Sequence, residues 1–556
     1  MKTVELRPDR SLLKPNFDGY KLSLEPIPIL RAALNAESAK PNRIRPSEAQ
    51  YSHLHAQMFG LQNHLTRDPW APGSCYFVNR NFGVCSVQYN EISGKLMPLV
   101  EVFKIEVEES SEIYNCSLVF VSEKYALVAD GRKELHIVDT GDRRKQGEWH
   151  KKLTVASPEW NGGCVLEDGR FEIVNGERQI HAVGAHVVQE NGMFKTVLNW
   201  VQIVQKDCNA PWELHSCRVL KGRGYAYYCA LETKSNALVI ASDKSFKFAT
   251  NIDDEVSDLP INGTDAAAAP EERPLFQWSQ TAESIVITVP KIEGANYKVS
   301  NENLKLSVLS DTSLIVSNDG WFAAVDGELT SWIDETDEIQ ITLLKTTPGL
   351  WPFLYPGCPE EKGDRPDQDV APVSNLTSQL EECDFGTAGD EAEYTIERLD
   401  VASTETTHRV FLGGNVPLFR VMLRPGYPDA LALRYDVDGC LWLQHAGTDW
   451  TLRHEGTLNA FGYVQASKQQ RKFMSCSPDL NYAVICEAQR HVFIYKGNYN
   501  TAGGLRNRNG PQVSIGQQKL VSLEGNSEIL GICCENDYTI LLLECEILVL
   551  QLRIEE

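Results

Sequence analysis

The chain has 556 residues, of which 76 are acidic and 53 are Lys or Arg, giving a net charge of −23 and a pI near 5.1. This balance argues against non-specific binding to nucleic acid or anionic membrane, because both reward clustered basic residues. The apolar fraction of 42% is typical of globular proteins, and the length predicts more than one domain.

The first strand-like segment is "YKLSLEPIP", residues 20–28. The N-terminus before it lacks the apolar core of a signal peptide, and we expect no later segment to span a bilayer. The 15 cysteines are scattered without a C-x-x-C pair. We therefore expect reduced thiols rather than a disulfide framework.

From residue 75 onward the chain repeats one pattern: a short apolar strand, a turn rich in Asp, Asn and Gly, and a second strand. Turns at 129–131, 242–244 and 437–439 contain residues that tolerate positive φ. The units recur about every 40–55 residues, the spacing of four-stranded propeller blades. The sequence therefore predicts an all-β propeller of about seven blades, with residues 476–495 as the clearest blade. Two unrelated β domains are the alternative.

Two tracts interrupt this pattern. Residues 251–272 contain seven acidic residues and no Lys or Arg, and residues 356–392 are acidic and rich in Pro, with one possible short helix. Both tracts predict linkers around an insertion. The predicted segments are 1–250 and 393–556 as the two parts of one propeller, 251–272 and 356–392 as linkers, and 273–355 as an inserted domain. We expect residues 20–28 to close the ring against 547–554 at the C-terminal end.

Within 273–355, apolar residues alternate cleanly along several short strands, as in Ile285, Ile287 and Val289. About seven strands in this length predict a compact antiparallel β-sandwich. We expect three tryptophans to form its structural core: Trp278, Trp332 and Trp351. Trp321 and Phe322 are neighbours, and on a strand one of them must point outward. They are candidate anchors for a partner, or else both are covered.

Three motifs carry this inserted segment's resemblance to a known family. They are Trp-x-Gln-Thr at 278–281, Gly-x-Leu before Ser331 and Trp332, and Trp-Pro-x-Leu at 351–354. The segment resembles the CS domain of the NudC family. The flanks also resemble a member of that family, most clearly at 17–28, 380–385, 433–442 and 459–495. No resemblance is apparent across 141–215.

The resemblance implies a non-enzymatic co-chaperone linked to heat-shock protein 90, with client or propeller-containing proteins as partners. It also implies a cytoplasmic and nuclear location. A propeller scaffold in trafficking or RNA-related assemblies, with a purely structural insertion, is the alternative. A divergent hydrolase is a third hypothesis, because propellers also host enzymes.

The residues themselves predict no catalytic, cofactor or metal site. "KGRGYAYY" (221–228) lacks the third glycine of a dinucleotide loop and predicts a turn into a strand. His53 and His55 would share a face if 52–57 were a strand, but no ligand pattern completes a metal site there. Cys533 and Cys534 are adjacent in a predicted strand, so they should point to opposite faces as packing residues.

Overall fold

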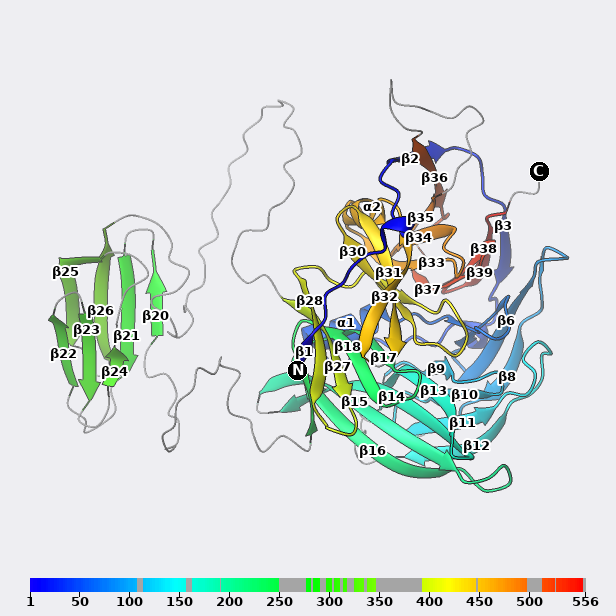
Figure 1. Cartoon of the computed structure of the whole chain (residues 1–556), viewed down its shortest axis with the longest axis horizontal. Coiled ribbons are helices and arrows are strands. Elements are labelled where there is room, and N and C mark those ends of the chain that lie inside the picture. The colour runs from blue at the N-terminus through cyan, green and yellow to red at the C-terminus, as the bar shows by residue number, and fades with distance from the viewer. Residues whose placement is uncertain are drawn as a thin grey trace. The chain divides into compact units, whose positions relative to one another are not determined.

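The computed structural model of the chain is shown in Figure 1. It describes all residues except 108–113, 157–162, 191, 250–276, 282–283, 291–296, 303–304, 311–313, 318–324, 335–337, 347–392, 447–448, 498–512, 526 and 554–556. Between residues 289 and 340 it describes only the course of the backbone. The chain divides into two units, one of residues 1–257 with 392–556 and the other of residues 258–391, and each is considered by itself.

The strands described in the first unit form seven sheets that follow one another as propeller blades, and the strands within each blade are antiparallel. The predicted all-β propeller of about seven blades is thereby confirmed. Blades 1 to 3 are continuous in sequence. Blade 1 contains β4 (Thr66–Arg67), β5 (Ser74–Val78), β6 (Gly83–Asn90), β7 (Lys95–Leu96) and β8 (Val100–Lys104). Blade 2 contains β9 (Ser117–Phe120), β10 (Tyr125–Ala129), β11 (Glu134–Asp139) and β12 (His150–Ala156). Blade 3 contains β13 (Val165–Val174), β14 (Glu177–Glu190), β15 (Met193–Gln205) and β16 (Glu213–Gly222).

Blade 4 contains the insertion between its second and third strands. Its strands are β17 (Ala226–Leu231), β18 (Ala237–Ser242), β27 (Tyr394–Asp400) and β28 (Thr406–Gly413). After β18, the short strand β19 (Phe246–Phe248) pairs with β16 of blade 3. Three whole blades and half of a fourth therefore precede the insertion.

Blades 5 to 7 follow in the last third of the chain. Blade 5 contains β29 (Phe419–Val421), β30 (Ala430–Tyr435), β31 (Asp438–Ala446) and β32 (Trp450–Leu458), and blade 6 contains β33 (Arg471–Cys476), β34 (Tyr482–Glu487), β35 (His491–Lys496) and β36 (Ser514–Ser522). Blade 7 contains β37 (Ile529–Cys534), β38 (Tyr538–Leu543) and β39 (Glu546–Gln551). The helix α2 (Phe461–Ala466) connects blades 5 and 6.

The predicted closing strand is wrong by one element. Residues 20–23 belong to β2 (Phe17–Ser23), which pairs in parallel with β36 of blade 6. The ring is closed by β3 (Ile29–Ala33), which pairs antiparallel with β39. Pro26 and Pro28 explain the division, because proline cannot donate a ladder hydrogen bond and interrupts a continuous strand.

The N-terminal strap, residues 2–33, passes the outer edges of four consecutive blades. β1 (Lys2–Thr3) pairs in parallel with β28 of blade 4. The 3-10 helix η1 (Arg10–Leu12) follows, and Asp9 N donates to His454 Nδ1 of blade 5 at 3.1 Å. β2 and β3 then add to blades 6 and 7. A second 3-10 helix, η2 (Glu37–Ala39), and the helix α1 (His53–Leu61) lie between the strap and blade 1.

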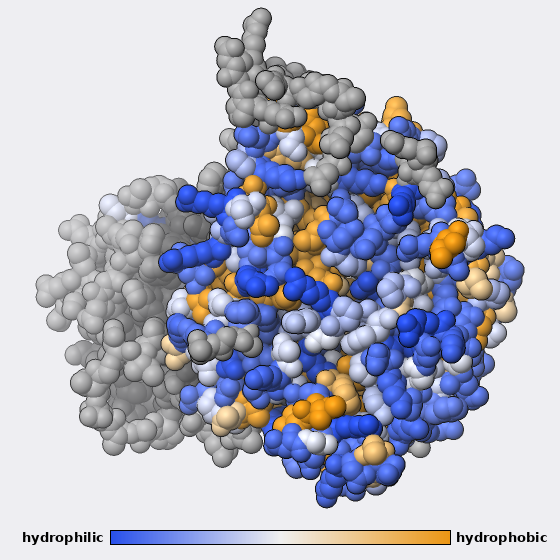
Figure 2. Space-filling model, turned by 45° about the vertical axis from the view of Figure 1, so that its right-hand side comes forward, coloured by the Kyte–Doolittle hydropathy of each residue, from blue (hydrophilic) through white to orange (hydrophobic). Residues whose placement is uncertain are grey.

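The core of the ring lies between blades. Within the described part of the first unit, each of the seven junctions between neighbouring blades contains a cluster of buried apolar side chains. Cys533 belongs to the cluster between blades 7 and 1, and Cys534 to the cluster between blades 6 and 7. The predicted packing of the two thiols on opposite faces is thereby confirmed. On the face in Figure 2, hydrophilic residues surround scattered hydrophobic ones.

Turn geometry explains some of the strand boundaries. Gly131 has φ +72°, and a Cβ there would lie 2.1 Å from the Tyr114 carbonyl oxygen, so only glycine fits between β10 and β11. The turn predicted at 437–439 lies slightly earlier, at Asp436 and Val437, with positive φ at Asp436. Asp and Asn tolerate this conformation better than most residues.

The second unit contains two described sheets. β20 (Gln277–Gln280), β21 (Ser284–Pro290), β26 (Glu338–Lys345) and β25 (Val325–Asp334) form one, and β22 (Tyr297–Glu302), β23 (Lys305–Ser310) and β24 (Leu314–Ser317) form the other. In the first sheet Ile285 and Ile287 are buried, whereas Val286 between them is only half-buried. The β-sandwich packing of the two sheets stays a prediction. Among the described helices, none is long and apolar enough to cross a membrane.

Candidate functional site

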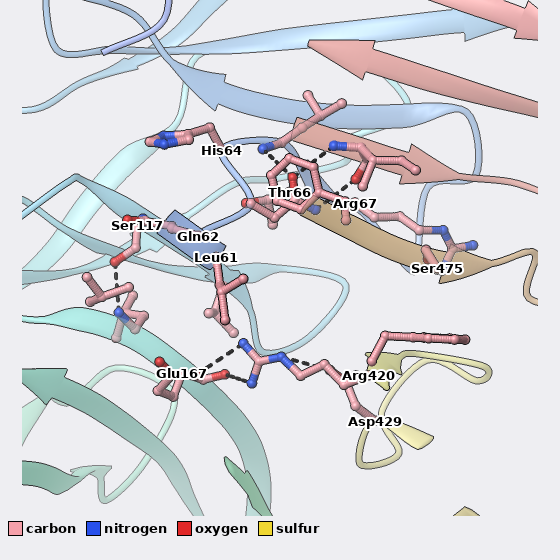
Figure 3. A pocket seen from close by; sticks show the side chains of 18 of the residues that line it. Leu61, Gln62, His64, Thr66, Arg67, Ser117, Glu167, Arg420, Asp429 and Ser475 are labelled. Carbon is pink, nitrogen blue, oxygen red and sulfur yellow. Dashed lines mark hydrogen bonds and ion pairs between the residues drawn. The ribbon is translucent and has the colours of Figure 1, made fainter. Parts of the chain in front are cut away.

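A central cavity of about 440 Å³ runs along the inner strands of the ring (Figure 3). The inner strand of every blade contributes lining residues, from β4, β9, β13, β17, β29, β33 and β37. Helix α1 also contributes, through Met58 and Leu61. Ser52 caps the helix, because its hydroxyl accepts a hydrogen bond from His55 N.

The segment after α1 is fixed to the blades on either side of blade 1. Asn63 makes a two-way contact with Ile532 of blade 7: its Nδ2 donates to the carbonyl oxygen at 2.8 Å, and its Oδ1 accepts from the amide at 2.9 Å. Gln62 Oε1 accepts from Asn115 Nδ2, next to blade 2, at 3.0 Å. These contacts position the next residues, His64 to Arg67, along the channel wall (Figure 3).

The charged groups of the channel neutralise one another. Arg67 makes a bidentate pair with Glu535, with both N–O distances at 2.9 Å. Arg420, on β29 of blade 5, reaches blade 3: its Nη2 is 3.3 Å from Glu167 Oε2, and its Nε is 3.9 Å from Asp429 Oδ2 (Figure 3). Burial raises the pKa of both Glu167 and Asp429, and the charge of Arg420 opposes that rise. Such pairing lowers the cost of burying charge.

His64 is a neutral polar group in this channel. Burial is the main reason that its pKa falls to about 3, and the charges of Lys472 and Arg43 add to the effect. The imidazole is therefore uncharged at neutral pH. Lys472 is itself paired with Glu528 at 2.8 Å.

The channel offers surfaces for binding more clearly than groups for proton transfer. Ser117 Oγ, a potential nucleophile, accepts a hydrogen bond from Leu166 N at 2.8 Å. A nucleophile needs an adjacent base that is itself held in place. Within the described residues, no group of three or more His, Cys, Asp or Glu could hold a metal ion.

The structure answers two of the motif questions. Residues 53–61 form a helix, so the condition under which His53 and His55 would share a strand face is not met. His55 is buried: its Nδ1 lies 2.8 Å from Ser52 Oγ, and its ring packs edge to face on Phe194. His53 is exposed, and its Nε2 lies 3.2 Å from Gln57 Nε2. The predicted turn in "KGRGYAYY" is confirmed, because β16 ends at Gly222 and β17 begins at Ala226.

The predicted residues of the inserted unit are only partly described. Trp278 is 2% exposed and lies on β20, opposite Ile287. Trp332 lies on β25 opposite Ile341, and its side chain is not described. Trp321, Phe322 and Trp351 lie outside the described residues. The anchor role of Trp321 and Phe322 and the core role of Trp332 and Trp351 stay predictions.

The channel residues carry no sequence motif that could have identified them. Arg67, Glu167 and Arg420 come from three blades and from positions far apart in the chain. The only available signal was indirect: each belongs to the first short strand of a repeat unit or lies just beside it. Such a strand is the innermost one in a propeller blade.

Searches for similar proteins gave a consistent result. No family model matches the chain. The chain is 30% identical to NudC domain-containing protein 1 of Mus musculus over 96% of both chains, and 29% identical to the protein of that name from Xenopus tropicalis over the same shares. Among solved structures, the Cps50 (Swd1) β-propeller domain of Myceliophteria thermophila covers 88% of this chain and 98% of its own, with 7% identity and a TM-score of 0.37. The nuclear movement protein from E. cuniculi GB-M1 covers 15% of this chain and 98% of its own, with 18% identity and a TM-score of 0.14.

Proposed function

The chain belongs to the family of NudC domain-containing protein 1, and from this we propose that it is a non-enzymatic co-chaperone that links heat-shock protein 90 to client or partner proteins. The family resemblance stated from the sequence is thereby confirmed. The inserted unit would hold one partner and the propeller another. We also propose that the protein acts in the cytoplasm and nucleus.

The observation that carries this proposal is the match over 96% of both chains. Because the match spans the ring as well as the insertion, it relates the whole arrangement to the family. Family membership and the propeller fold together support a protein-interaction role. The paired charges of the channel are compatible with this role, since charges that already have partners are poorly suited to proton transfer.

A comparison of purified proteins tests the proposal. The full chain and a variant lacking residues 273–355 are each titrated with heat-shock protein 90, and affinity is measured by biolayer interferometry. We expect the deletion to weaken binding at least tenfold. A matched control replaces residues 273–355 with an unrelated folded domain of similar size, which keeps both linkers, and it should bind as weakly as the deletion.

Undiminished binding by the deleted chain would show that the inserted unit does not recruit the chaperone. The scaffold alternative would then be favoured, because the ring alone would account for the interactions. Circular dichroism must show that the propeller is folded in all three proteins. A loss of binding can then be assigned to the inserted unit and not to unfolding.

A further inference from the structure

A second cavity, of about 280 Å³, lies beside the start of α1. Three parts of the ring line it. Ser52, His53 and Leu54 come from the start of α1, Phe194 from β15, and Arg223, Tyr225, Tyr227 and Asp243 from the edges of blade 4. Tyr225 and Tyr227 also line the central channel, so they separate the two spaces.

The rings of Phe194, Tyr225 and Tyr227 line this cavity, and two further tyrosines contact these rings. Tyr225 lies just before β17 and Tyr227 lies at an irregularity in the β17 register, and their rings meet edge to face. Their ring centroids are 5.1 Å apart at an interplanar angle of 82°, and Tyr394 continues the series at 5.5 Å and 76° from Tyr227. On the side of α1, Tyr51 packs edge to face on Phe194 at 5.0 Å and is 69% exposed. Exposed tyrosines are typical of protein-binding surfaces.

The arrangement of the rings limits what can bind. Tyr225, Tyr227 and Tyr394 form one edge-to-face series, here called the ridge, and Tyr51 and Phe194 form a separate edge-to-face pair. An extended chain that lies along the ridge makes more contact than a compact ligand does. Aromatic ridges of this kind are how proteins recognise proline-rich segments in the polyproline II conformation.

Two charged side chains beside the ridge have no ion-pair partner among the described residues. Arg223 is exposed, and Asp243 is half-buried. Asp243 Oδ1 accepts a hydrogen bond from Tyr225 N at 3.2 Å, which leaves its second oxygen available. A polyproline II chain has no internal hydrogen bonds and exposes its carbonyl oxygens. Arg223 can donate to those carbonyls, and Asp243 can pair with a basic side chain.

We propose that this cavity binds a proline-rich segment of a partner protein that carries a lysine or arginine next to its prolines. The proline rings would pack on Tyr225, Tyr227 and Phe194, and the basic side chain would pair with Asp243. This inference goes beyond the proposed function, because it assigns a partner chemistry to the ring and does not depend on the chaperone.

Fluorescence anisotropy with the full chain tests the proposal. The probe is a labelled decapeptide with one N-terminal Arg followed by repeats of Ala-Pro-Pro. Two matched peptides replace the Arg with Glu or all prolines with Ala. We expect saturable binding of the probe, and at least tenfold weaker binding of both matched peptides. Absence of saturable binding, or equal binding of the three peptides, would overturn the proposal.

Variants locate the binding on the chain. Asp243→Asn keeps the acceptor for Tyr225 N but removes the charge, so it should reduce the preference for Arg over Glu. Tyr51→Ala, at an exposed position, and Tyr227→Ala should each weaken binding at least fivefold. Tyr463→Ala removes a 59% exposed tyrosine on α2 and is the matched control. If Tyr463→Ala weakens binding as much as Tyr51→Ala does, the cavity is not the site.

The chain's own prolines provide a second decisive comparison. Residues 347–372, which precede Tyr394 in the chain, contain six prolines. A full-length variant with these prolines replaced by alanine should bind the probe as the unmodified chain does. If the probe binds only to that variant, the cavity recognises a segment of its own chain, and the assignment to a partner is wrong.

Discussion

The two halves of the propeller rim are held by different means. Blades 4 to 7 have the N-terminal strap along their outer edges, through β1, η1, β2 and β3. In blades 1 and 2 the outermost described strands, β8 and β12, have no such cover, and β19 covers only three residues of β16 in blade 3. Contact with the strap, mostly by backbone pairing, therefore secures one half, and the other half depends on contacts between neighbouring blades, chiefly those of their side chains.

A buried ion pair shows how side chains hold the uncovered half. Arg143, in the loop between β11 and β12 of blade 2, reaches Asp68 of blade 1, with its Nε 2.5 Å from Oδ2. Its guanidinium also stacks on Phe120 at 4.5 Å. Both side chains are at most 1% exposed. We therefore expect blades 4 to 7 to be destabilised most by deletion of the strap, and blades 1 and 2 by substitution of single side chains.

The largest expected effect comes from removing the strap. Deletion of residues 1–33 takes away β3 and leaves β39 with an unpaired edge, exposing buried Ile547 and Leu548. We expect this variant to show no cooperative thermal transition. Deletion of residues 1–13 removes only β1 and η1, so it should melt cooperatively at a slightly lower temperature. A cooperative transition near the original temperature for the longer deletion would show that the ring does not need β3.

The second effect concerns the uncovered half. Arg143→Ala leaves Asp68 buried without its counter-charge, which typically costs about 3–5 kcal/mol of unfolding free energy. Urea denaturation measures this loss. The neighbouring Arg144 is 78% exposed, and Arg144→Ala serves as the control with little expected change. Equal losses from both variants would show that the buried pair does not secure blades 1 and 2.

A smaller effect should appear when the pH is lowered, at the contact between the strap and His454. His454 Nε2 lies 2.9 Å from the Gly456 carbonyl oxygen and donates to it, so Nδ1 is free to accept from Asp9 N. Burial lowers the pKa of His454 below its usual 6.5. The unfolded chain then binds a proton first, so the stabilisation is complete above pH 6.5 and is lost as pH falls toward the folded pKa.

Hydrogen exchange of residues 9–12 between pH 7 and pH 5 measures this loosening, which should amount to about 1 kcal/mol, the contribution of one hydrogen bond. His454→Phe should abolish the pH-dependent part, and His445→Phe, at an exposed position of β31, should leave it intact. A pH dependence that persists in His454→Phe would assign the effect to another group.

The smallest effect is expected at the start of the strap. Lys2 pairs with Asp449, and both side chains are more than half exposed. Exposed pairs contribute less than about 1 kcal/mol because solvent and salt screen them. Lys2→Ala should therefore shift the melting temperature only slightly, and added salt should remove the difference. A shift in melting temperature as large as that of Arg143→Ala would mean that β1 contributes more to stability than its two paired residues suggest.

Much of the fold could be read from the sequence, because strands and turns are specified locally. The alternation at Ile285 and Ile287 and the Asp-Gly turn at 130–131 are each visible within a few residues of sequence. The candidate binding sites were harder to predict from the sequence. Phe194, Tyr227 and Tyr394, which lie at or beside the cavity next to α1, are separated by long stretches of chain and share no motif.

By itself the sequence determined that this chain is an all-β propeller in two parts and a member of the NudC family. The tertiary structure alone decided that β3 closes the ring, that the insertion interrupts blade 4, and that Arg143 meets Asp68. The physical reason is that a strand edge can pair with any other free edge. The choice among edges depends on ring geometry and on how prolines such as Pro26 and Pro28 divide a segment, and not on local preference.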